Sequence, residues 1–301
     1  MKSMINLNRT VKFFIASSVI LFSKSTGAQN FSGLTRLDAK SQVVYYSAGA
    51  DVKAIRLADQ VAKVNDYYAK HLGFTPQVNL LVLNGDDWKK FAAHPVYGMP
   101  HYKNDHTLIV AAGNNPFWQS FIPPLDKIPA EHAEKIRKVY TGADGELTME
   151  PFFDLLAIHE LGHAYHFQDS LNMQRNWLSE LFVNIFLHTY VAENEPGLLP
   201  ALTTFPDMVV ALTEPSTLKF TSLSDAHTRY NEIAVNHPQN YGWYQSRWHS
   251  AAGKIYDHGG IKVITGLWTA LQSERRKLPD DELIAMLGTV STELGRIITN
   301  W

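Results

Sequence analysis

The segment FDLLAIHELGHAYHFQDS, residues 153–170, constrains this chain more than any other part of it. Apolar residues recur at helical spacing on both sides of its centre, and no proline or run of charges interrupts them. His159 and His163 are four residues apart, so they lie on one face of the predicted helix, about 6 Å apart along its axis. Glu160 lies about 100° around the helix from His159. The segment is therefore either a metal site or a core or surface helix that happens to carry histidines.

The pattern His-Glu-x-x-His favours the metal site. Two neutral imidazoles can bind one ion, and a neighbouring carboxylate can reach a water on that ion without displacing it. Zinc-dependent hydrolysis requires this arrangement. We therefore predict one Zn²⁺ ion, with His159 and His163 as ligands and Glu160 as the general base.

A third protein ligand must come from further along the chain, because catalytic zinc usually has three protein ligands and a water. One known continuation has glycine three residues after the second histidine and a third histidine three residues later. The sequence has His166 and Asp169 at those positions, so it lacks this continuation. The segment NWLSELFVNIFLHTY, residues 176–190, offers Glu180 instead. A carboxylate among so many apolar residues is costly unless it is paired or bound to a metal, so we predict Glu180 as the third ligand.

Alternatives to this ligand set stay open at the level of sequence. Glu180 could lie on the solvent side of an amphipathic helix. Glu193 and Glu195 are rival ligands, although they fall in a turn that ends the helix. His166 is three residues beyond His163, a step that turns it away from the ion. We expect His166 to contact a ligand residue or to lie on the surface.

The composition limits both the fold and the metal chemistry. The chain has 301 residues, of which 45% are hydrophobic and 12% aromatic, so it can bury a large core as one domain or two lobes. It has no cysteine, which excludes disulfides, thiolate zinc sites and cysteine nucleophiles. Any metal ligands must therefore be His, Asp or Glu.

Residues 1–28 are typical of an export signal. Basic residues precede or open the apolar run 13–22, and small residues follow it at STGA. About ten apolar residues are too few to span a bilayer, which needs roughly 20. We expect residues 29–301 to form the mature protein, secreted or periplasmic and not inserted in a membrane. An uncleaved anchor or a disordered tail is the alternative.

The charge balance gives no indication of a nucleic-acid partner. Residues 1–28 contain four basic residues and no acidic one, so the net charge changes from -2 for the whole chain to -6 without them. A binder of nucleic acids would carry a basic surface.

The pattern of elements predicts an α+β fold. Residues 41–47, 77–85 and 106–113 are predicted strands, and a helix is expected over 51–73. These elements would form a small mixed α/β lobe at about 41–125.

From about residue 126 to 301 the pattern is mainly helical. The segment 124–140 is polar and amphipathic, and the histidine helix follows it. Further helices are expected over 176–192, 204–213, 240–258, 260–272 and 279–299. The histidine helix then lies at the junction of the two lobes, where clefts often hold functional sites.

The sequence HELGH, followed by a helix that contains WLSELFVN, resembles the gluzincin group of zinc metallopeptidases, which includes thermolysin-like and aminopeptidase-like enzymes. The resemblance implies a zincin-like fold, with His159, His163 and Glu180 as zinc ligands and Glu160 as the general base. Gluzincins often have an aspartate four residues after the ligand glutamate, which orients a ligand histidine. Here that position is Asn184, which can accept the same hydrogen bond without bringing a charge.

The resemblance also implies two features outside the ligand segments. The strand 106–113 would be an edge strand that pairs with an extended peptide substrate. A tyrosine near the start of a later helix would stabilise the oxyanion, and Tyr244 fits that pattern best. Tyr241 is the runner-up, followed by His237 and His249.

The expected function is that of a secreted zinc peptidase, with a peptide or protein as substrate. Glu160 would take a proton from the water that attacks the carbonyl and deliver it to the leaving amine. A secreted zinc- or peptide-binding domain without catalysis is the alternative, and hydrolysis of a non-peptide amide or ester is a third possibility.

Overall fold

The computed structural model describes residues 31–39, 42–103 and 106–301. The predicted signal at 1–28 lies outside this range. The described residues form a small five-stranded mixed sheet followed by a mainly helical part, which confirms the α+β prediction at this level. In the described residues, no helix combines the length and hydropathy needed to cross a bilayer.

The sheet has the strand order β1-β2-β3-β5-β4. The β2/β3 and β3/β5 pairs are parallel, whereas β1/β2 and β4/β5 are antiparallel. The strands are β1 (Thr35–Asp38), β2 (Val43–Tyr46), β3 (Asn79–Leu83), β4 (His101–Lys103) and β5 (Thr107–Ala111). The three predicted strands correspond to β2, β3 and β5.

The predicted edge strand is not at the edge of the sheet. β5, within the predicted strand 106–113, pairs with β3 on one side and with β4 on the other. The short strand β4 forms that edge instead. It contains only three residues, so its sequence carries no alternating apolar pattern of its own.

Helices α1 to α4 belong to the region of the sheet and the connection that follows it. They are α1 (Asp51–Leu72), α2 (Gly85–Phe91), α3 (Pro116–Gln119) and α4 (Ala130–Tyr140). Gly73 ends α1 in the left-handed conformation, as expected for a glycine at this position.

The later helices contain most of the helical residues. They are α5 (Glu150–Gln168), α6 (Asn176–Asn194), α7 (Leu199–Leu212), α8 (Leu223–Thr228), α9 (Tyr230–Asn236), α10 (Pro238–Gly259), α11 (Ile261–Ser273), α12 (Asp280–Val290) and α13 (Thr292–Thr299), with short 3₁₀ turns at Pro196–Leu198 and Pro215–Thr217. The helix predicted over 279–299 is thus two helices. Ser291 separates them and caps the second by accepting a hydrogen bond from Leu294 N–H.

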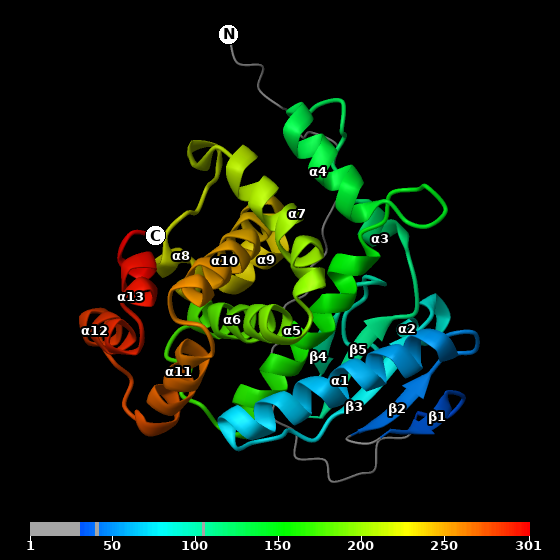
Figure 1. Cartoon of the computed structure of the whole chain (residues 1–301), viewed down its shortest axis with the longest axis horizontal. Helices are drawn as coiled ribbons and strands as arrows, with labels where there is room; N and C mark the ends of the chain where they lie inside the picture. The colour runs from blue at the N-terminus through cyan, green and yellow to red at the C-terminus, as the bar shows by residue number, and fades with distance from the viewer. Residues whose placement is uncertain (1–30, 40–41, 104–105) are drawn as a thin grey trace.

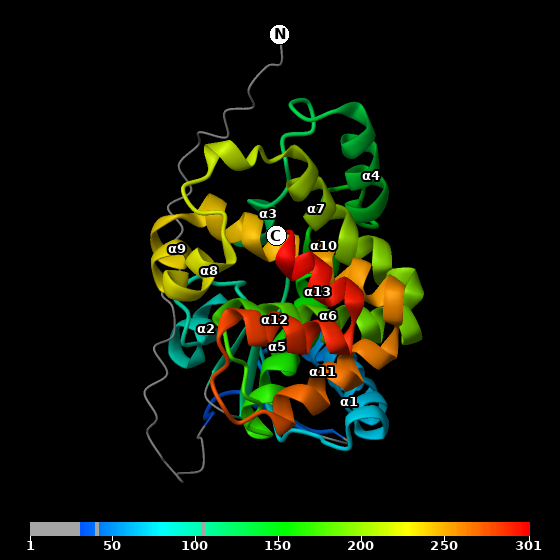
Figure 2. The same ribbon diagram turned by 90° about the vertical axis from the view of Figure 1, so that its left-hand side faces the viewer.

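Helix α5 contacts strands β4 and β5 as well as helices α6 and α7, so it lies between the sheet and the later helices (Figure 1). Helices α11, α12 and α13 lie on the side of the helical part that is away from the sheet. The turned view has this side facing the viewer (Figure 2). The histidine helix therefore occupies the junction that the sequence predicts.

Alternate residues of β3 enter two hydrophobic cores. Leu80 and Val82 join the larger core, which includes residues of α1, α5, α6, α10 and α11. Leu81 and Leu83 join a smaller core that contains Trp88 and lies on the other face of the sheet. A strand that is buried on both faces has a continuous apolar sequence, as β3 does.

An ion-pair cluster fixes the start of α5 against α1. Lys53 Nζ lies 2.7 Å from Asp154 Oδ1 and 3.0 Å from Glu150 Oε1, and its side chain is only 8% exposed. Arg56 pairs with the other oxygen of Asp154. Removing one partner from such a buried pair would leave an uncompensated charge.

Gly162 allows α5 and α6 to approach closely. A Cβ atom at this position would lie 3.1 Å from Val183 Cβ and 3.3 Å from Phe186 Cδ1. Both contacts are tighter than ordinary van der Waals distances. The glycine inside the HELGH pattern thus brings the helix of the two histidines next to the helix of Glu180.

The loop that joins α5 to α6 is anchored to a distant segment. Its residues Ser170 and Gln174 have φ angles of 54° and 57°, which are uncommon for residues other than glycine. The Gln174 amide donates to the carbonyl of Arg276 at 2.8 Å and accepts from Leu278 N–H at 2.9 Å. These bonds satisfy two backbone groups of the segment between α11 and α12. They hold the α5–α6 loop, and therefore the start of α6, against that segment.

Candidate metal centre

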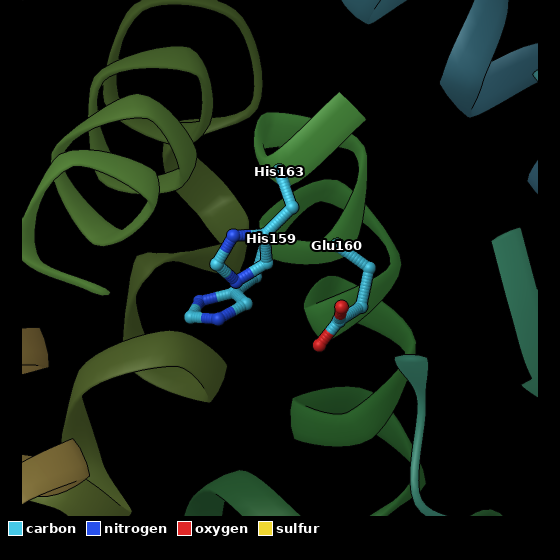
Figure 3. Close-up of side chains that lie close together, drawn as sticks. All are labelled: His159, Glu160 and His163. Atoms are coloured by element: carbon cyan, nitrogen blue, oxygen red, sulfur yellow. The ribbon is translucent and has the colours of Figure 1, made fainter. Parts of the chain in front are cut away.

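His159, Glu160 and His163 form a group that could hold a metal ion. One ligand atom from each of the three residues lies within 4.8 Å of the others. The two imidazole rings meet edge to face, with centroids 5.1 Å apart. Figure 3 shows both rings on one side of α5, with the Glu160 carboxylate beside them.

Helix α6 places Glu180 against the same two histidines. Its Oε2 lies 3.5 Å from His159 Nε2, and its Oε1 lies 3.9 Å from His163 Nε2. In a tetrahedral zinc site with bonds of about 2.1 Å, ligand atoms are about 3.4 Å apart. The separation from His159 Nε2 is close to this value, and the separation from His163 Nε2, measured from the other oxygen of Glu180, is longer. The side chains of His159, His163 and Glu180 are 8%, 14% and 11% exposed. All three are therefore mostly buried, and His163 is the most accessible.

The carboxyl groups of Glu160 and Glu180 differ in their pKa values. Burial raises the pKa of Glu160 to about 7, and the nearby charge of Glu180 adds to this effect. Burial would also raise the pKa of Glu180, but His159, His163 and Gln245 outweigh it and lower this pKa to about 2. Glu180 is therefore ionised at neutral pH, whereas Glu160 can exchange a proton there.

The two candidate ligand histidines also differ in their pKa values. Burial lowers the pKa of His163 to about 4, which keeps its imidazole neutral. Burial lowers the pKa of His159 as well, but Glu180, Glu160 and Asn184 outweigh it, and the net shift is upward.

The edge strand β4 contacts the general-base candidate. The backbone N–H of Tyr102 donates to Glu160 Oε2 at 3.0 Å. The Tyr102 hydroxyl accepts from Gln168 at the end of α5 at 2.9 Å. The β4 backbone therefore holds one oxygen of Glu160 and lies directly beside the candidate metal ligands.

Asn184 and His166 contact the other ring nitrogen of each histidine. Asn184 Oδ1 lies 3.3 Å from His159 Nδ1, and its amide also donates to the backbone carbonyl of Glu180 at 2.9 Å. His166 Nε2 lies 2.9 Å from His163 Nδ1. His166 is only 3% exposed, so it is a contact of a ligand residue and not a surface residue.

Hydroxyl and amide groups from α9 and α10 surround Glu180. Tyr230 donates its hydroxyl proton to Glu180 Oε1 at 2.9 Å, and Gln245 donates to Oε2 at 3.1 Å. The Tyr241 hydroxyl lies 3.4 Å from the Tyr230 hydroxyl and accepts from Gln245 at 3.1 Å. Burial and the charges of Glu180 and Glu160 raise the pKa of Tyr241, so its hydroxyl stays protonated.

The structure does not bring Tyr244 to this site. Its hydroxyl donates to the carbonyl of Ser222 at 2.7 Å, and its ring stacks on Trp248 and Trp301. The expectation for Tyr244 is corrected on this geometry, because its side chain belongs to the packing between α10 and the C-terminal end. Tyr241, the runner-up, is the tyrosine of α10 whose hydroxyl contacts Tyr230 and Gln245, the two residues that donate to Glu180.

The remaining alternatives lie outside the ligand group. Glu193 and Glu195 accept hydrogen bonds from Tyr256 and Tyr190, near the far end of α6. His237 lies beside Lys219 and Glu232.

His249 and Tyr230 complete the surroundings of the site. The ring of His249 packs parallel to that of His159, with centroids 6.1 Å apart. Tyr230, like Gln245 and Tyr102, is a site residue that the sequence did not indicate. It begins a seven-residue helix, and no spacing pattern connects it with Glu180, 50 positions earlier.

Comparison with models of protein families gave no match, and comparison with curated protein sequences gave none either.

Proposed function

We propose that this protein is a zinc-dependent peptidase with a zincin-like fold. The observation that carries the proposal is the position of Glu180, whose two carboxylate oxygens face the Nε2 atoms of His159 and His163 at 3.5 and 3.9 Å. Two imidazoles and one carboxylate are the ligand set of several catalytic zinc sites, and they leave one position open.

Glu180, not Glu160, is the proposed third ligand. Both carboxylates are near the histidines, so proximity alone does not decide between them. Glu180 faces both Nε2 atoms and stays ionised, as a ligand should. Glu160 has one oxygen on the backbone of Tyr102 and a pKa of about 7, which suits a group that accepts and returns a proton.

The residues divide the reaction between them. Zinc, when bound by His159, His163 and Glu180, supplies a Lewis acid that polarises the carbonyl and makes a water acidic enough to lose its proton near neutral pH. Glu160 accepts that proton and delivers it to the leaving amine.

Tyr241 takes the role that the resemblance assigns to a tyrosine. Its protonated hydroxyl, next to Tyr230 and Gln245, donates a hydrogen bond to the carbonyl oxygen as negative charge develops there. The Tyr230 hydroxyl is already engaged with Glu180, so Tyr230 serves to hold the ligand.

The surroundings of the site suit an extended peptide as substrate. The short strand β4 is the last strand of the sheet, and its residue Tyr102 contacts Glu160. An extended chain can pair with such an edge through backbone hydrogen bonds. Tyr230 also lines a surface pocket together with Asn176, Arg229 and their neighbours. We further propose export through residues 1–28, in line with their signal-like sequence.

The variant Glu160→Gln tests this function. It keeps the size of the side chain and all three proposed ligands but removes the proton acceptor. We expect it to bind zinc stoichiometrically by metal analysis and to lose hydrolysis of a denatured protein or a peptide library. If the wild type cleaves no peptide and matches the variant, the alternative of a binding domain without catalysis is correct. Cleavage of small acyl substrates alone would instead indicate a non-peptide amide or ester as substrate.

A further inference from the structure

His166 is a buried histidine of α5 to which the proposed function gives no role. Its Nε2 lies 2.9 Å from His163 Nδ1 and 3.0 Å from the hydroxyl oxygen of Ser179. Ser179 immediately precedes Glu180 on α6. One imidazole therefore connects the helix that carries two proposed ligands with the helix that carries the third.

The position of His163 determines where the ring protons must be in the metal-bound protein. His163 Nε2 faces Glu180, so this nitrogen must offer its lone pair to the ion. A neutral imidazole has one N–H group, which then resides on Nδ1. This N–H points to His166 Nε2 and can donate only if that nitrogen is unprotonated. The proton of His166 must accordingly be on its own Nδ1.

We infer that His166 is the positioning residue of His163. In this role His166 is neutral and carries its own proton on Nδ1. Its Nε2 then accepts the Nδ1–H of His163 and orients the ligand ring. This inference rests on the proposed function, because it assumes that His163 binds a metal ion. A ligand histidine usually donates to a carboxylate, a backbone carbonyl or a water. Here both ligand histidines have uncharged side-chain partners, an amide oxygen of Asn184 and an imidazole nitrogen of His166.

Ser179 also contacts His166 Nε2, and its removal should have the opposite effect on zinc binding to the removal of His166. An unprotonated ring nitrogen has one lone pair, and both His163 N–H and the Ser179 hydroxyl lie within reach of it. The serine therefore competes with the ligand histidine for the same acceptor. Removing its hydroxyl leaves the acceptor entirely to His163.

The first experiment measures zinc affinity by competition with a chromogenic chelator. We expect His166→Phe, which keeps a planar ring without an acceptor, to weaken zinc binding by about 10- to 100-fold. His166→Gln offers an amide oxygen as acceptor and should recover most of this loss. Ser179→Ala should bind zinc at least as tightly as the wild type.

His188→Phe is the matched control. His188 is also a buried histidine, 7% exposed, and lies two turns beyond Glu180 on α6 with its ring next to Tyr256. We expect this variant to keep the zinc affinity of the wild type. Denaturant unfolding of each variant without metal separates a loss of orientation from a loss of folding.

The second experiment is made on the wild-type protein, and a variant serves only to assign the signals. In zinc-loaded wild type labelled with ¹⁵N-histidine, the ring signals of His166 should show the proton on Nδ1. The His166→Gln spectrum identifies those signals by their absence. A proton on Nε2 of His166 in the loaded protein, or equal zinc affinity of His166→Phe and wild type, would overturn the inference while zinc binding and hydrolysis stand. A wild type that does not bind zinc overturns the proposed function, and this inference with it.

Discussion

At the scale of single residues, α10 shows how closely two tyrosines can resemble each other in sequence and differ in place. Tyr241 and Tyr244 both lie among aromatic and apolar residues, so helical spacing alone did not decide which one faces the ligands. The structure places Tyr241, Gln245 and His249 along one line at intervals of four residues. The same interval separates Glu180 from Asn184 on α6. These two rows of polar residues, one on α10 and one on α6, were the sequence signal that could have identified Tyr241.

The two tyrosines give a matched pair of substitutions. We expect Tyr241→Phe to lower kcat by about 10²- to 10³-fold with unchanged zinc affinity, because it removes one donor to the developing negative charge. Tyr244→Phe removes only the hydrogen bond to Ser222, so it should leave kcat unchanged and cost about 1 kcal/mol of stability. Steady-state kinetics and denaturant unfolding of both variants check this. Equal kinetic losses in the two variants would contradict the assignment of Tyr241.

At the scale of elements, the long periodic segments could be predicted and the short ones could not. The helices α1, α5, α6, α10 and α11 carry enough apolar repeats to define themselves locally. Strands β1 and β4 have four and three residues, and each exists only through pairing with its neighbour. The sequence therefore predicts the edge position for β5, because no pattern in it indicates β4, the strand that covers β5.

The contact between α5 and α6 was equally hidden from the sequence. The pattern HELGH predicts where two ligands lie on one helix, but the distance to Glu180 depends on how closely the next helix packs. Gly162 sets that distance, because its missing side chain leaves room for Val183 and Phe186. Packing between helices thus completes the site that local spacing begins.

Gly162→Ala tests this packing. Alanine is favoured over glycine in a helix by up to about 1 kcal/mol, so helix propensity alone predicts a more stable protein. The added methyl group, however, would meet Val183 at 3.1 Å, and overpacking of this kind costs about 1–3 kcal/mol. We expect a net loss of stability in denaturant unfolding and weaker zinc binding. A variant that is more stable and binds zinc normally would show that α5 and α6 can separate without moving the ligands.

At the scale of the whole molecule, the candidate centre joins parts of the chain that are far apart in sequence. The sheet contributes Tyr102 to Glu160, α5 and α6 contribute the ligands, and α9 and α10 contribute Tyr230 and Gln245 to Glu180. A metal ion at this point would bind only the folded chain, because the unfolded chain does not hold these groups together. Zinc should therefore act as a stabilising ligand of the entire fold.

Removal of zinc provides the test at this scale. A ligand that binds only the folded state at 1,000 times its Kd adds about 4 kcal/mol to the free energy of unfolding. We expect chelation to lower the thermal midpoint of the wild type and added zinc to restore it. Glu160→Gln should show the same shift, because it keeps the three ligands. Glu180→Gln should show a much smaller one, because it replaces a charged ligand with a neutral amide. A full zinc-dependent shift in Glu180→Gln, combined with its loss in Glu160→Gln, would exchange the roles of the two glutamates.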